Sequence, residues 1–155
     1  MKRNGFTIAE LITVVAIIAI LAAVAMPIAS FGIKRQKEIE LRETLRRITN
    51  AIDAYKELRD ATGPAAIKKP PDFGQRDYPK TLDELTKPIE LNNGKMVRLL
   101  RERDLIDPMT GKNEWTTVSD SDDPDSSETN GDNVWEVHSK STALSLDGKT
   151  HYNEW

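Results

Sequence analysis

The stretch GFTIAELITVVAIIAILAAVAMPIASFGI, residues 5–33, decides the fold. From position 11 to position 33 the stretch carries no charge and consists mainly of Ile, Val, Leu and Ala. An α-helix rises about 1.5 Å per residue, so a helix of this length crosses a hydrocarbon core of about 30 Å. We therefore expect a membrane-spanning helix over residues 6–33.

Glu10 is the unusual residue of this stretch. A lone carboxylate in hydrocarbon costs several kcal/mol or takes up a proton. An ordinary signal peptide has an apolar stretch of about 7 to 15 residues and a small-residue cleavage site, which residues 22–25 resemble, so that interpretation stays open. A cut between Gly5 and Phe6 would instead create an amino group about one helical turn from Glu10, and the two charges could then pair.

At these residues the chain resembles the prepilin family, which comprises type IV pilins and the pseudopilins of type II secretion. The resemblance rests on a short basic leader that ends in Gly5, followed by Phe6, Glu10 and the apolar helix. Pro27 falls at the twenty-second position after the leader, where these proteins commonly have a proline.

The resemblance implies that a prepilin peptidase removes residues 1–5 and that the new amino group of Phe6 is methylated. It also implies that Glu10 pairs with the Phe6 amino group of a neighbouring subunit in a homopolymer. Pro27 is expected to kink the helix, because proline removes a helical hydrogen bond. The basic leader predicts a cytoplasmic N-terminus, with the remainder crossing the bacterial inner membrane into the periplasm.

Residues 34–62 continue the helix with a different pattern. Apolar residues recur at spacings of three and four and mark one face, while the opposite side is charged. Gly63 and Pro64 are the expected stop. We predict one nearly continuous helix over residues 6–62, apolar in its first half and amphipathic in its second. Residues 34–155 then form the periplasmic domain.

Short elements follow an irregular, proline-rich connector. Thr81 and Glu84 have capping-box spacing, which predicts a helical turn after them. Residues 97–106 are a short apolar stretch for which a helix is one interpretation. Strands are expected at residues 115–118 and 134–138, a third around 143–146, with residues 152–155 packed nearby. The expected fold class is α+β: a long N-terminal helix packed on a small antiparallel sheet, as in type IV pilins.

The soluble half is similar to the major pseudopilins of type II secretion. The similar segments are YPKTLDEL, residues 78–85, and DPMTGKNEW, residues 107–115, although Ile106 replaces the proline usual before the latter. The chain has no cysteine, whereas type IV pilins commonly close their C-terminal region with a disulfide. The resemblance implies sister and minor pseudopilins, the peptidase and methyltransferase, and the inner-membrane secretion platform as partners.

Calcium is the one cofactor that the resemblance suggests. Major pseudopilins hold calcium in a loop before the last strand, but here that loop keeps only Asp147 as an obvious ligand. A separate acidic insert contains Asp122, Asp123 and Asp125, without the spacing of an EF-hand. A solvated acidic loop is the simpler interpretation, and a calcium site that combines these aspartates with Asp147 is the alternative.

Composition favours a structural role. A formal net charge of -3 argues against nucleic acid as a partner, which usually meets a basic face. His138 and His151 are the two histidines, and the sequence has no G-x-S-x-G or P-loop motif, so an enzyme is not expected. Two alternatives to a secretion pseudopilin remain: a pilin of a surface fibre, and a membrane-anchored periplasmic binding module that does not polymerise.

Overall fold

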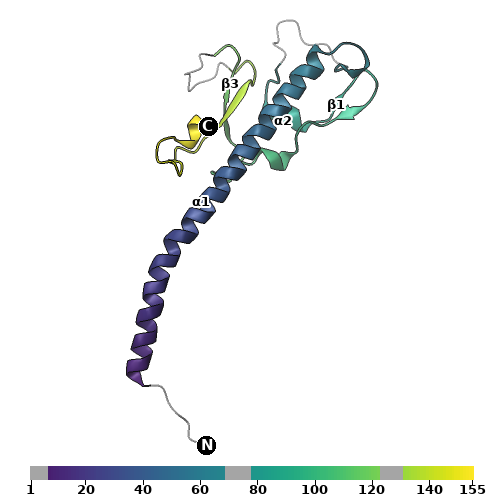
Figure 1. The fold of residues 1–155 in the computed structure, drawn as a ribbon. Coiled ribbons are helices and arrows are strands. Elements are labelled where there is room, and N and C mark those ends of the chain that lie inside the picture. The colour runs from purple at the N-terminus through teal and green to yellow at the C-terminus, as the bar shows by residue number, and fades with distance from the viewer. Residues whose placement is uncertain (1–6, 69–77, 123–130) are drawn as a thin grey trace, which may run out of the picture. The chain divides into compact units, whose positions relative to one another are not determined.

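The computed structural model describes residues 7–68, 78–122 and 131–155. The chain divides into two compact units, residues 1–36 and residues 37–155, which are described separately. One helix, α1 (Ile8–Asp60), contributes to both, and Figure 1 shows it as an unbroken ribbon. The predicted long helix is thereby confirmed. Pro27 lies within α1 and does not end it, and the kink expected there stays a prediction.

The first unit is the apolar part of α1. Its large apolar side chains are exposed in the single chain, from 49% for Val14 to 78% for Ile8. Within the described part of the chain, α1 is the one helix long and apolar enough to cross a membrane. The described residues of this unit therefore offer nothing against which its apolar surface could be buried.

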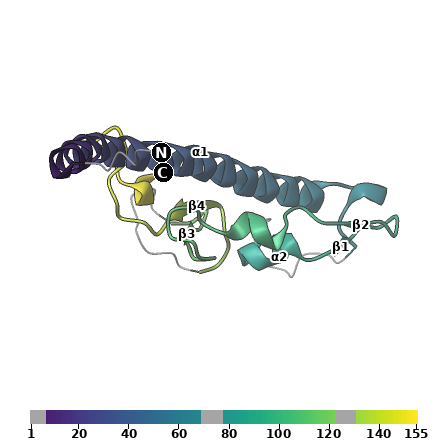
Figure 2. The same ribbon diagram turned by 90° about the horizontal axis from the view of Figure 1, so that it is seen from below.

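The second unit is built on one face of α1. Leu41, Ile48 and Ile52 are fully buried, and they belong to the apolar face that the spacing predicted. Their cluster includes the fully buried Tyr152 and side chains from the short elements: Leu85, Leu100, Leu105, Trp115, Val134 and Val137. Figures 1 and 2 show these elements along the second half of α1.

The strands form two separate two-stranded antiparallel sheets. β3 (Trp115–Val118) pairs with β4 (Glu136–Ser139), with Trp115 opposite Ser139. β1 (Ile89–Glu90) pairs with β2 (Met96–Val97) through a turn at Asn93 and Gly94. The α+β class with a small antiparallel sheet is confirmed, and the β1–β2 hairpin is an addition that the sequence interpretation missed.

Two strand predictions need correction. β4 starts two residues later than expected, because the Val134 amide donates to Pro79 O at 2.7 Å and so does not join the ladder. The strand expected at residues 143–146 is only an isolated bridge between Leu144 and His151. The chain turns back at once there, and the Ser145 amide bonds Thr150 O at 2.9 Å, which leaves no length for a strand.

The short helical elements also differ from expectation. The turn after Thr81 is α2 (Leu82–Thr86), but the Thr81 side chain makes no cap bond; Glu84 Oε2 instead accepts the Lys80 amide at 3.2 Å. The stretch at 97–106 is not one helix. It comprises the end of β2 and a 3-10 helix, η2 (Glu102–Leu105). Two more 3-10 helices, η1 (Gly63–Ala65) and η3 (Tyr152–Glu154), complete the fold.

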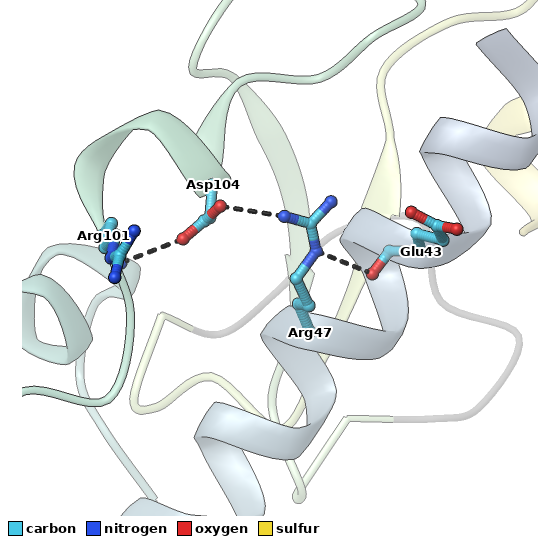
Figure 3. A network of polar contacts seen from close by, with 4 residues as sticks. All are labelled: Glu43, Arg47, Arg101 and Asp104. Carbon is cyan, nitrogen blue, oxygen red and sulfur yellow. Dashed lines mark hydrogen bonds and ion pairs between the residues drawn. The ribbon is translucent and has the colours of Figure 1, made fainter. Parts of the chain in front are cut away.

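An ion pair joins η2 to α1 (Figure 3). Arg47 Nη1 lies 2.9 Å from Asp104 Oδ1, and Arg47 Nε donates to Glu43 O at 3.3 Å. Asp104 Oδ2 accepts the Arg101 amide at 3.3 Å, so one carboxylate both caps η2 and binds the helix. The Arg47 side chain is 47% exposed, so the pair positions η2 more than it stabilises the fold.

Candidate functional site

The candidate site is the start of α1, where Thr7 and Glu10 cap the helix reciprocally. Glu10 Oε2 accepts hydrogen bonds from the Thr7 amide at 2.9 Å and from Thr7 Oγ1 at 3.0 Å. The Glu10 amide donates in turn to Thr7 Oγ1 at 3.3 Å. This is a capping box, which satisfies amide donors that the first helical turn leaves without partners.

The capping box gives the Glu10 carboxylate a role inside its own chain. Two hydrogen bonds hold the carboxylate, and it lies at the helix end where the backbone dipole favours negative charge. The cost of a carboxylate beside an apolar stretch is therefore partly offset before any partner is met. The sequence analysis did not assign this role to Thr7, although the T-x-x-E spacing is a recognised signal.

The residues on the other side of the predicted cleavage site, Gly5 and Phe6, lie outside the described residues. Cleavage, methylation and pairing of the Phe6 amino group with Glu10 therefore stay predictions. What the structure adds is the position of Glu10, in the first turn of a helix whose following residues are apolar and exposed.

The aspartates of the predicted calcium site are only partly described. Asp123 and Asp125 lie outside the described residues. Asp122 Oδ2 accepts the Ser119 amide at 2.8 Å. Among the described residues no group of three or more His, Asp or Glu side chains gathers as a metal would require. A calcium site at these aspartates stays a prediction.

Asp147 organises its own loop. Its Oδ1 accepts the Ser145 hydroxyl, the Lys149 amide at 2.8 Å and the Thr150 amide at 3.1 Å, and its Oδ2 accepts Thr150 Oγ1 at 2.9 Å. These bonds, that of the Ser145 side chain foremost, hold the pKa of Asp147 well below its usual range. The carboxylate thus closes a turn, and a calcium ion would have to replace some of these donors.

The remaining candidates for chemistry have backbone partners. His138 Nδ1 lies 2.7 Å from Trp155 O, and His151 Nδ1 lies 2.7 Å from Thr142 O. The carboxylate of Asp107 is fully buried; it accepts the Met109 amide within its own turn and the Ser139 hydroxyl from the end of β4. Each of these groups is engaged in a contact that holds the chain together.

Comparison with known protein families identifies a motif in the first 26 residues. They match the family model described as the prokaryotic N-terminal methylation motif, residues 1–26. Comparison with curated proteins gave no match, and neither did comparison with solved structures. The match, the long helix and the small sheets support a type IV pilin-like prepilin with an apolar helix capable of membrane anchoring. Such a motif implies processing by a prepilin peptidase and polymerisation, and proteins that carry it are structural subunits.

Proposed function

We propose that the chain is a structural subunit of a type II secretion pseudopilus, which drives export of folded proteins through the outer membrane. The observation that carries the proposal is Glu10, capped by Thr7 in the first turn of an apolar, exposed helix that matches the methylation motif. Lack of cysteine and the segments YPKTLDEL and DPMTGKNEW favour a pseudopilin over a pilin.

The energetics of the apolar helix specify how such a subunit assembles. Each large apolar side chain left in water costs about 1.5 to 3 kcal/mol, so exposing the whole span would cost tens of kcal/mol. The helix must therefore pass from lipid directly into a bundle of sister helices. In this proposal residues 1–5 are removed, Phe6 is methylated, residues 6–33 form the filament core, and residues 34–155 lie in the periplasm.

Glu10 is proposed to pair with the Phe6 amino group of a neighbouring subunit during that transfer. The capping box that holds Glu10 in the single chain would open or be shared when this ion pair forms. Small residues in the span, such as Ala16, Ala19 and Ala23, would let sister helices approach closely.

Substitutions at Glu10 test the assembly step. Glu10→Ala should still insert and be cleaved but should yield little filament. Glu10→Gln separates two roles, because glutamine can also complete a capping box but carries no charge. If pairing with an amino group is required, the Gln variant assembles as poorly as the Ala variant. Normal filament yield from Glu10→Ala would refute the pairing.

A comparison of cells with and without the gene tests the secretion role. If folded proteins disappear from the culture medium and accumulate in the periplasm, the pseudopilin interpretation stands. The alternative is a pilin, for which export stays unchanged while surface fibres vanish. If neither export nor surface fibres change, the protein is instead a membrane-anchored binding module that does not polymerise.

A further inference from the structure

A groove opens in the second unit, between α1 and the last residues of the chain. Its volume is about 470 Å³, and we call it the C-terminal groove. Leu45 and Trp155 give it a largely apolar surface, so an apolar group of a partner would displace water from it favourably. The other lining residues are Arg42, Asp147 and Thr150.

Contacts inside the chain hold the groove in shape. The Arg42 guanidinium lies 4.3 Å from the centre of the Trp155 ring, and the Tyr152 ring packs edge-on against Trp155 with 5.2 Å between centres. Trp155 Nε1 donates to Thr150 Oγ1 at 3.2 Å. The groove therefore exists before a partner arrives, which reduces the entropy that binding costs.

The β1–β2 hairpin presents a side chain that suits this groove. Met96 is 61% exposed, the highest value for a large apolar side chain among the described residues of the second unit. Methionine is flexible, and its sulfur makes favourable contacts with aromatic rings such as an indole. Its neighbour Lys95 is exposed and forms no ion pair in the described part of the chain. It offers a positive charge that complements the exposed carboxylate of Asp147.

The hairpin and the groove belong to different levels of α1. The hairpin is tied to the end of α1, because Ile67 bridges Leu91 and the Ile67 amide donates to Leu58 O at 3.2 Å. Leu58 follows Leu45 by thirteen positions, or about 20 Å along the helix. Figure 1 also shows the hairpin and the C-terminal residues on opposite sides of α1. The hairpin of one chain thus cannot enter its own groove, but it can enter that of another copy.

We propose that the β1–β2 hairpin of one copy docks in the C-terminal groove of a second copy. Met96 then packs against Leu45 and Trp155, and the Lys95 ammonium lies beside Asp147 at the rim. The second copy is displaced by about 20 Å along α1, away from the membrane. This rests on the proposed function, because copies anchored by the same helix in one membrane share an orientation.

The contact can repeat from copy to copy. It joins two different surfaces, so it is heterologous and leaves a hairpin free at one end of the row and a groove at the other. Because the two surfaces lie on opposite sides of α1, each further copy moves sideways in the same sense as well as along the axis (Figure 1). The third copy therefore does not return to the line of the first. Copies at one level in the membrane cannot form the contact, so it arises only when one copy is raised.

Substitutions at Met96 in the full-length chain test the contact. Met96→Glu should lower the yield of sedimentable filament at least about fivefold, because it would bury a carboxylate against the indole. Met96→Leu should keep most of the yield, because it conserves apolar volume. Ile106→Glu, at another exposed apolar residue of the second unit, is the matched control and should change little. Membrane levels of each variant, measured by immunoblot, separate assembly from folding.

Cysteines test which surfaces meet, since the natural chain has none. Lys149 is exposed and next to Thr150 of the groove. A chain with both Met96→Cys and Lys149→Cys, treated with a short bismaleimide, should give a ladder of dimers, trimers and longer products, because each copy uses both surfaces. Neither single variant should crosslink, because equivalent residues of adjoining copies are at least about 20 Å apart, beyond the reach of the reagent.

Three results would overturn the proposal. Products of the double cysteine variant that stop at the dimer would show a closed, reciprocal pair instead of an open row. Normal filament yield from Met96→Glu, or filaments of the double variant without crosslinks, would reject this contact, leave the groove to a different partner and keep the filament function intact. A natural chain that forms no sedimentable filament would reject the proposed function as well.

Discussion

Tyr152 is the residue whose ionisation the fold opposes most clearly. Its ring is fully buried, and its hydroxyl donates to Glu38 Oε1 at 2.8 Å. Burial, together with the hydrogen bond and the negative charge of Glu38, raises the pKa of Tyr152 to about 12. Glu38 Oε1 also accepts the Leu146 amide at 2.6 Å, so one carboxylate joins α1 to the C-terminal loop.

Stability should therefore fall in alkali. Because the pKa of Tyr152 is higher in the folded chain, its contribution is complete below about pH 10 and is lost as pH rises towards 12. Burial also raises the pKa of Tyr55, which adds to the same trend. We expect the free energy of unfolding, measured by urea titration, to decline between pH 10 and 12, and Tyr152→Phe to reduce the decline. An equal slope in both proteins would contradict this assignment.

Asp107 should be the costliest carboxylate to remove. It is fully buried, and it accepts the Met109 amide at 2.8 Å and the Ser139 hydroxyl at 2.7 Å. Asp107→Ala deprives two donors of their partner, with an expected cost of about 3 kcal/mol. Asp107→Asn keeps an acceptor oxygen and should cost less. Thermal unfolding of both variants is the measurement, and similar melting temperatures for the natural chain and Asp107→Ala would show that the donors find other partners.

Among the elements, the β1–β2 hairpin depends on a turn that few residues can make. Gly94 has a φ of +76°, in the left-handed region, and a Cβ at this position would meet nothing within 4 Å. The cost of Gly94→Ala is thus conformational, about 1 kcal/mol. Gly94→Asn should cost less, because asparagine tolerates this conformation better. Chemical denaturation measures both; an Ala variant as stable as the natural chain would mean that the turn rearranges.

The sequence predicted the elements to different degrees. α1 was predictable because its apolar spacing extends over many turns, and β3 because aromatic and β-branched residues fill it. The β1–β2 hairpin was missed although Asn93 and Gly94 are a typical hairpin turn, since strands of two residues show no alternation. The T-x-x-E pattern occurs at both Thr7 and Thr81, but only Thr7 forms a capping box, so the spacing alone does not decide.

At the scale of the whole molecule, the candidate site was predictable from local chemistry, whereas contacts distant in sequence were not. Glu10 was identified because a carboxylate in an apolar stretch is costly unless it has a partner. The bonds of Glu38 to Leu146 and Tyr152 join residues more than a hundred positions apart, and no pattern in the sequence marks them.

The two units should be separable. Every residue of the buried cluster lies at or after Leu41, so the apolar span contributes nothing to that core. We expect a fragment of residues 34–155 to be soluble, to unfold cooperatively, and to form no filaments. Circular dichroism and sedimentation velocity are the measurements, and the full-length chain in detergent is the control. A fragment that is unfolded would show that the span supports the domain.

The same fragment allows a test of calcium binding. If Asp122, Asp123, Asp125 and Asp147 hold a structural ion, binding to the folded state alone raises its melting temperature, and at 100 times the dissociation constant the gain is about 2.7 kcal/mol. Calcium must then compete for Asp147 oxygens that already accept bonds from Ser145, Lys149 and Thr150. Asp147→Asn should abolish the calcium response, whereas Asp83→Asn, at an exposed aspartate in α2, should keep it. Identical melting curves in chelator and in millimolar calcium would exclude a structural site and leave Asp147 as the residue that closes its own turn.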